Sequence, residues 1–246
     1  MPQPQRSHPS SKTKQLAPRN ALLRRATRHD RALLLPHLTQ VSLGKGDVLV
    51  HAHRPIRQVY FPENALGSVV ALTREGRRIE VGLFGRDGMS APSLLHGADR
   101  SPLETFTQVP GPAFQIAVAP LREIIAQSPS FAALLLRYVE AFNVQVSHTV
   151  VANGIYTLEE RLARWLLMTH DRLDGDDLPL VQEFLAMMLA VRRAGVTEAL
   201  QVLQEAGVIK AARGLITIVS RARLAEIAGG SYGPPEAEYR RLVGAL

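Results

Sequence analysis

Two short helices joined by a tight turn are predicted in residues 180–209. Apolar residues at helical spacing predict the first helix over about residues 181–189 and the second over about 193–206, where Gly207 ends it. Small and branched side chains between the two segments allow the helices to cross closely. A short hairpin follows at once, with its turn at residues 211–214. The sequence therefore predicts a winged helix-turn-helix unit.

The second predicted helix and the hairpin carry polar side chains that suit contacts with DNA. Arg192 and Arg193 open the helix, and Thr197 and Gln201 follow on its outer face. Arginine can bind guanine through two hydrogen bonds, and threonine and glutamine can bind bases or phosphates. Arg213 lies at the tip of the hairpin, where it could reach a phosphate. The helix pair alone is equally compatible with an ordinary helical hairpin and a solvated arginine pair, but the hairpin that follows it favours a DNA-binding unit.

Charge and composition narrow the classes of partner. The net charge of +7 favours nucleic acid or an anionic membrane surface, although part of the excess lies in the first 31 residues. The chain has no cysteine, which excludes disulfides, cysteine zinc sites, thiolate iron–sulfur clusters and cysteine nucleophiles. We find no secretory signal and no apolar run long enough to span a bilayer, so we expect a cytoplasmic protein without membrane contact.

The first half of the chain changes from a polar tail to β-rich segments. Residues 1–20 are rich in Pro, Ser, Gln and Lys and predict a disordered basic tail. Asn20 can cap a helix that runs to about Leu38. Short β-rich runs between glycine and charged turns fill residues 41–118 and predict an antiparallel sandwich or roll.

A long helix is predicted from Ser128, which can cap it, with Pro129 at its first position. Residues 153–154 (Asn-Gly) should break the chain, and Thr157 with Glu160 forms a capping box for the next helix. An apolar stripe at spacings of three and four follows the long helix: Phe131, Leu134, Leu135, Tyr138, Val139, Phe142, Val146, Thr149 and Val150. The stripe is compatible with a helix packed on its own domain, but its length favours a coiled coil between two copies of the chain.

The order of these segments resembles the Crp/Fnr family of bacterial transcription regulators, from about Leu33 to Gly229. Three segments carry the resemblance: GKGDVLV with VYFPENALGSVV, GRDGMSAPSLLHGADRSPLETFTQV, and QEFLAMMLAVRRAGVTEALQVLQEAGVI followed by RGLITI. The fold class that it implies is α+β, with an N-terminal antiparallel, jelly-roll-like β-roll, a long dimerisation helix and a C-terminal winged helix-turn-helix. The expected divisions are a disordered basic tail (1–20), a cyclic-nucleotide-binding-like β-roll sensor domain (21–127), the dimerisation helix and hinge (128–156), the DNA-binding domain (157–229) and a C-terminal tail (230–246).

The resemblance implies a homodimer on a near-palindromic operator in double-stranded promoter DNA, with RNA polymerase as a further partner. Two recognition helices would enter major grooves about 34 Å apart. Arg193 is then the best candidate for a base contact, and Gln182 is placed for a phosphate contact. Ala194 stands where cyclic-AMP-responsive members carry a glutamate, and Glu198 stands where they carry an arginine. The operator should therefore differ from the cyclic-AMP consensus.

The sensor segment departs from the family's cyclic-nucleotide cassette. Gly88 is followed by Met89, so the carboxylate that holds the ribose hydroxyl is missing. Arg100 and Ser101 stand near the position of the phosphate-binding pair, but Pro102 follows them. An arginine and backbone amides can still hold an anion, so these two residues are candidates for binding an unknown small-molecule effector. The alternative is a solvated loop.

Two other classes of protein remain as alternatives. A β-roll also resembles the cupins, some of which are metalloenzymes, and His51 and His53 would lie on one strand face as in the cupin metal motif. The glutamate that should follow is replaced by Arg57 and Gln58, so we predict no metal site and no cofactor. No P-loop, dinucleotide fingerprint or nucleophile elbow is visible, so we predict that the protein is not an enzyme. A ligand-binding module without DNA activity is the second alternative.

Overall fold

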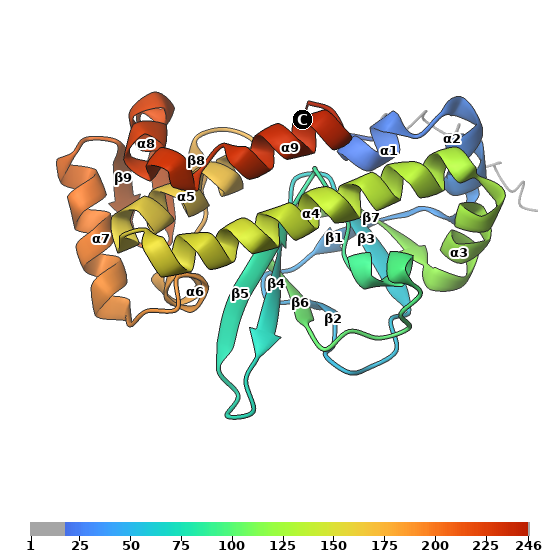
Figure 1. Ribbon diagram of the computed structural model, residues 1–246, viewed down its shortest axis with the longest axis horizontal. Coiled ribbons are helices and arrows are strands. Elements are labelled where there is room, and N and C mark those ends of the chain that lie inside the picture. Colours follow the sequence, from blue (N-terminus) through green and yellow to red (C-terminus); the bar gives the residue numbers. More distant parts are fainter. Residues whose placement is uncertain (1–17, 246) are drawn as a thin grey trace, which may run out of the picture.

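The computed structural model describes residues 18–245 of the chain. Its long helix α4 (Pro129–Ile155) crosses most of the molecule, with β-sheets packed below it and a smaller helical unit at its C-terminal end (Figure 1). The predicted α+β class and the order β-roll, long helix and winged helix-turn-helix are confirmed. No helix in residues 18–245 is long and apolar enough to cross a membrane.

Two antiparallel sheets form the β-roll. The strand order is β1-β7-β3 in one sheet and β2-β6-β4-β5 in the other. Phe61, Val69 and Ile116 from the two sheets are buried in one core with Leu135 of α4. The strands are β1 (Thr39–Leu43), β2 (Val48–Val50), β3 (Gln58–Pro62), β4 (Leu66–Leu72), β5 (Arg78–Phe84), β6 (Glu104–Val109) and β7 (Gly111–Ala117).

The N-terminal segment forms two helices rather than the single helix predicted to residue 38. Helix α1 (Ala21–Arg25) is capped by Asn20 as expected, but Ala26 adopts an extended conformation. The capping box of Thr27 and Asp30 then begins α2 (Arg28–Leu34), because its side chains satisfy the free N–H groups of a new helix. The predicted disordered tail falls on residues 1–17, which lie outside the described residues, and on residues 18–20, of which Asn20 is fully buried.

Helix α4 begins where it was predicted but continues further. The Ser128 hydroxyl accepts a hydrogen bond from the N–H of Phe131, with Pro129 in the first turn. The helix runs through Asn153 and Gly154 to Ile155, so the predicted break at Asn-Gly is wrong. A glycine weakens a helix by only about 1 kcal/mol, and the chain turns instead where the Thr157 capping box starts α5 (Leu158–His170).

The apolar stripe that we assigned to dimer contacts is largely used inside the chain. Its first six members, from Phe131 to Phe142, are buried against the β-roll and neighbouring helices, whereas Val150 is 70% exposed. For that part of the stripe the alternative interpretation, a helix packed on its own domain, is the correct one. A different face of α4 is exposed, with residues at spacings of three and four: Ala133, Leu136, Glu140, Asn143, Ser147, Val150 and Gly154.

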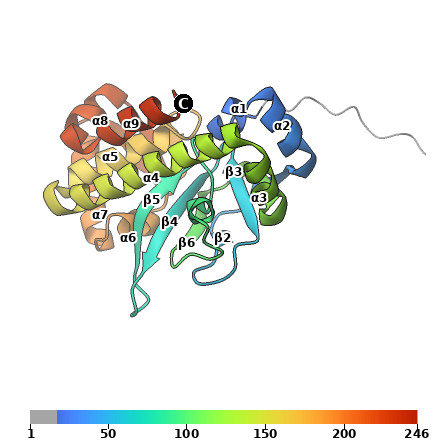
Figure 2. The same cartoon turned by 45° about the vertical axis from the view of Figure 1, so that its right-hand side comes forward.

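The C-terminal residues form a helix where the sequence predicted only a tail. Helix α9 (Pro234–Leu242) lies along α4 in both views (Figures 1 and 2). Tyr239 and Val243 join the core of the β-roll, and the Tyr239 hydroxyl donates to the carbonyl of Asp87. The remaining elements are α3 (Val118–Gln127), β8 (Asp177–Leu178), α6 (Gln182–Met188), α7 (Arg193–Glu205), β9 (Ile209–Ala212), β10 (Leu215–Ile218), α8 (Arg221–Ala228) and the short 3-10 helices η1 (Leu35–His37), η2 (Pro92–His96) and η3 (Gly229–Ser231).

Candidate nucleic-acid interface

Helices α6 and α7 form the predicted helix pair, with ends within one or two residues of the expected ones. Ala190 in the turn between them has a left-handed φ of 53°, a conformation that alanine adopts at some cost. The cost is tolerated because the turn lets Leu185 of α6 pack against Val196 and Leu200 of α7. Gly207 follows α7 with a φ of 69°, which fits the predicted helix stop.

The wing is a three-stranded sheet in the order β8-β10-β9. Arg213 and Gly214 form the turn between β9 and β10, and Gly214 has a φ of 77° that favours glycine. The side-chain oxygen of Gln204 on α7 accepts a hydrogen bond from the N–H of Ala211 at 2.8 Å. This contact holds the wing beside α7. It could not be predicted from the sequence, where Gln204 is one of several polar residues on the outer face of the helix.

A hollow of about 680 Å³ lies between the start of α6, the outer face of α7 and the wing. All six predicted DNA-binding residues are exposed on this unit. Five of them line the hollow: Gln182, Arg193, Thr197, Gln201 and Arg213. Arg192 does not line it, because it precedes the first helical residue of α7 as the N-cap. The structure thus brings together the five residues over a common concave surface.

The side chains over this surface are held only by weak contacts. The Arg193 guanidinium lies 3.1 Å from the carboxylate of Glu183, but the two side chains are 67% and 73% exposed. Exposed ion pairs of this kind contribute only about 0–1 kcal/mol, so Arg193 can leave Glu183 for another anion at little cost. The Thr197 hydroxyl donates to the carbonyl of Arg193, and Gln201 donates to Glu205 on the same helix.

The winged unit shares a core with the β-roll, a feature that the sequence did not indicate. The ring of Phe184 on α6 packs against Phe106 of β6 with centroids 5.7 Å apart. The Lys45 ammonium lies over the Phe184 ring, 5.3 Å from its centroid. Leu66 and Leu83 of the β-roll are buried in the same cluster as the apolar residues of the winged unit.

Two buried polar contacts also connect the β-roll to the segment that carries the winged unit. Arg172, just after α5, lies 2.7 Å from the carboxylate of Asp87, and the two side chains are 6% and 3% exposed. The indole N–H of Trp165 on α5 donates to the carboxyl of Glu80 on β5 at 2.8 Å. Burial raises the pKa of Glu80 to about 7, although the nearby guanidinium of Arg164 lowers it in part.

The candidate effector residues are not arranged as a preformed anion site. The Arg100 guanidinium contacts the carboxylate of its neighbour Asp99, and the Ser101 hydroxyl accepts from the N–H of Leu103. Met89 is fully buried in the core. A Cβ added to Gly88 would lie 2.3 Å from the hydroxyl of Tyr138, so a side chain there has no room.

The histidine pattern does not have the geometry of a cupin metal motif. His51 and His53 are exposed and lie in the turn after β2, so the interpretation that they share a strand face is wrong. His53 has a φ of 61°, which places it in a left-handed turn and not in a strand. Within residues 18–245 no three histidine, aspartate or glutamate side chains gather in a way that could hold a metal ion.

Comparison with known families identifies the unit that contains this surface. Residues 160–227 match the family described as the Crp-like helix-turn-helix domain. The C-terminal unit is thus similar to the Crp-like helix-turn-helix domain. No curated protein matches the chain.

The Crp-like domain lies in a chain whose whole fold matches solved regulators. FixK2 from Bradyrhizobium japonicum is 18% identical, with a TM-score of 0.68, over 78% of this chain and 98% of that one. A Crp/Fnr family protein from Eubacterium rectale is 19% identical, with a TM-score of 0.63, over 82% and 94% of the two chains. The c-di-GMP-responsive regulator CLP from Xanthomonas campestris is 15% identical, with a TM-score of 0.60, over 79% and 100%. The resemblance to the Crp/Fnr family is confirmed.

Proposed function

We propose that the chain is a transcription regulator that binds a specific DNA sequence as a homodimer. The observation that carries the proposal is the concave surface between α6, α7 and the wing, over which five exposed polar residues meet. Arg193 at the start of α7 can reach a guanine, and Arg213 on the wing can reach a phosphate on the flank. Gln182 opens α6 and suits a second phosphate contact.

The exposed face of α4 supports the proposed dimer. Its residues recur at alternating spacings of three and four, which is the spacing of a coiled-coil seam. Leu136 and Val150 on this face are 51% and 70% exposed, and a second copy packed along it would bury both. Two copies joined along this face would present two α7 helices to a near-palindromic operator, and a regulator on promoter DNA would meet RNA polymerase there.

We propose an operator and an effector that differ from those of cyclic-AMP-responsive relatives. Ala194 is exposed next to Arg193 but has no group that can read a base, and Glu198 can accept a hydrogen bond from cytosine. On the sensor side, the buried Met89 cannot supply a carboxylate to a ribose hydroxyl. Arg100 remains 58% exposed and could hold an anion, so an effector of another kind is the proposal for this loop.

The test of the DNA-binding proposal uses the full chain and a matched pair of arginines. Genome-wide mapping of bound DNA supplies the operator, and binding is then measured against a scrambled duplex at several salt concentrations. Replacing Arg192 and Arg193 with alanine should abolish the preference for the operator, because one bidentate contact contributes about 1–3 kcal/mol of discrimination. The control replaces Arg28 and Arg31 of α2, which are exposed and do not line the hollow. Unchanged preference in the first variant would show that α7 is not the recognition helix.

A further inference from the structure

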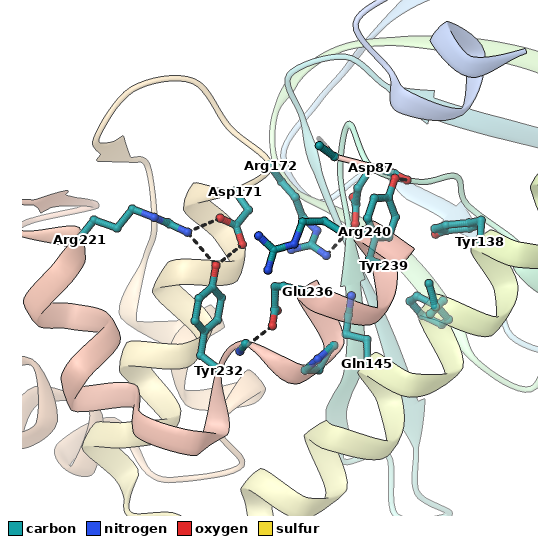
Figure 3. A pocket seen from close by; sticks show the side chains of 15 residues that line it. Asp87, Tyr138, Gln145, Asp171, Arg172, Arg221, Tyr232, Glu236, Tyr239 and Arg240 are labelled. Atoms are coloured by element: carbon teal, nitrogen blue, oxygen red, sulfur yellow. Dashed lines mark hydrogen bonds and ion pairs between the residues drawn. The ribbon is translucent and has the colours of Figure 1, made fainter. Parts of the chain in front are cut away.

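A second cavity lies where the β-roll, the long helix and the Crp-like domain meet. Its volume is about 440 Å³, which is within the usual range for small-molecule sites. It is lined by residues of the loop after β5, of α4, of the end of α5, of α8 and of α9 (Figure 3). Neither the concave surface beside α7 nor the loop of Arg100 and Ser101 contributes to it.

One wall of this cavity is apolar and aromatic. Phe142 and Ala141 of α4 form it together with Pro235 and Tyr239 of α9. Tyr239 has no free hydroxyl, because that group donates to the carbonyl of Asp87. This wall can therefore cover an apolar group of about the size of an aromatic side chain and exclude water from it.

Most of the charged groups in the cavity are already paired. Arg172 is bound to Asp87, and Arg221 lies 2.6 Å from Asp171. The Tyr232 hydroxyl donates to the second oxygen of Asp171 at 2.8 Å. Burial and the Asp171 carboxylate raise the pKa of Tyr232, so this hydroxyl stays protonated as a donor. Each of the two ion pairs is neutral overall, so together they add little net charge to the cavity.

Two charged groups and one amide still have unused hydrogen-bonding atoms among residues 18–245. The guanidinium of Arg240 forms no hydrogen bond or ion pair there, and it extends into the cavity (Figure 3). Gln145 accepts from the N–H of Leu83 through its oxygen, which leaves its amide N–H groups free on the cavity side. Glu236 accepts from the N–H of Gly233 through one carboxylate oxygen and keeps the other free. A ligand in the cavity would therefore meet the cationic donor Arg240, the neutral donor Gln145 and the anionic acceptor Glu236.

We infer that this cavity binds a free α-amino acid with a large apolar side chain. Arg240 and Gln145 would hold the α-carboxylate, Glu236 would hold the α-ammonium group, and the side chain would lie against Phe142 and Pro235. A zwitterion matches one open cation and one open anion, whereas a dianion such as a phosphate monoester would lie close to three carboxylates. All of these contacts lie on α4 and α9, so the bound ligand would hold these two helices together.

Four probes separate the contributions of the ligand groups. L-Phenylalanine and L-tryptophan carry both charges, 3-phenylpropionate lacks the ammonium group, and phenethylamine lacks the carboxylate. Binding to the full chain is measured by titration calorimetry and by the shift in Tm. We expect an amino acid to bind and each single-charge analogue to bind about tenfold more weakly or worse, as the loss of a charged hydrogen bond implies. Equal binding of amino acid and analogues, or no binding of either amino acid, would overturn the proposal.

Three variants locate the site. Arg240→Gln should weaken the amino acid and 3-phenylpropionate but not phenethylamine. Glu236→Gln keeps an oxygen for the Gly233 N–H and should weaken the amino acid and phenethylamine but not 3-phenylpropionate. Arg241→Gln makes the same charge change on an exposed residue that does not line the cavity, and it should change none of the affinities. If Arg240→Gln and Arg241→Gln weaken binding equally, the ligand is attracted by general charge and the assignment is wrong. None of these results depends on DNA binding.

Discussion

Replacing Glu80 with glutamine should stabilise the folded protein at neutral and alkaline pH. The Glu80 side chain is buried between the β-roll and α5, where one oxygen accepts from Trp165 and the other has no partner. A buried carboxyl group without a full set of hydrogen bonds is more stable in its neutral form. Glutamine has nearly the same shape, can still accept from the indole and carries no charge.

The magnitude follows from the difference between the pKa of Glu80 in the folded and unfolded chain. Burial raises this pKa from 4.5 to about 7, and each pKa unit corresponds to about 1.4 kcal/mol. Below pH 4.5 both states are protonated and the group has no effect on stability. As the pH rises toward 7 the unfolded state loses its proton first, so the wild type loses up to about 3 kcal/mol of stability, and above pH 7 the loss is complete.

Urea denaturation at pH 5, 6, 7 and 8 tests this expectation. The single tryptophan of the chain is Trp165, which lies against Glu80 and reports unfolding by its fluorescence. The quantity to follow is the stability of Glu80→Gln minus that of the wild type, since other titrating groups cancel in this difference. It should grow from about 1 kcal/mol at pH 5 to about 3 kcal/mol at pH 8. The same substitution at the exposed Glu123 of α3 is the control. A difference that stays constant would mean that Glu80 is ionised in the fold, and our argument from burial would be wrong.

Three further substitutions test the packing of the chain. Asp87→Ala leaves Arg172 buried without its carboxylate partner and should lower the unfolding free energy by about 3–5 kcal/mol in urea, while adding Arg172→Met should recover most of the loss. Val150→Glu places a charge on the exposed face of α4 and should yield a monomer in analytical ultracentrifugation, with unchanged helicity by circular dichroism; a variant that sediments like the wild type would exclude this face from the dimer. Gly88→Ala forces a methyl group against Tyr138 and should lower stability by about 1–3 kcal/mol, and an unchanged Tm would show that the loop can yield.

The features that the sequence predicted well depend on local chemistry. The ends of α6 and α7 follow from apolar spacing and from Gly207, and the starts of α4 and α5 follow from the caps at Ser128 and Thr157. Each of these signals acts within a few residues, so no knowledge of the tertiary structure is needed to interpret it.

The features that the sequence missed depend on contacts between distant segments. Asp87 and Arg172 are far apart in the chain, and nothing in either neighbourhood indicates the ion pair. The spacing of apolar residues in α4 correctly predicted a buried face. It could not show whether the β-roll or a second chain covers that face. Helix α9 did have a local signal in a segment that we predicted only as a tail: Pro234 stands at its first position, and the Glu236 carboxylate accepts from the N–H of Gly233.

The contacts between the two parts of the chain explain how a signal on one side could act on DNA. Phe184 belongs to the first helix of the DNA-binding pair, yet its ring is packed on Phe106 of the β-roll. Any movement of β6 therefore moves α6, and α7 follows because the two helices share a buried core. The linker between α4 and α5 restricts the same geometry, since only Tyr156 and Thr157 separate the helices. This packing therefore contributes to the orientation of Arg193, and under the proposed function an effector that changes the packing would change how α7 meets DNA.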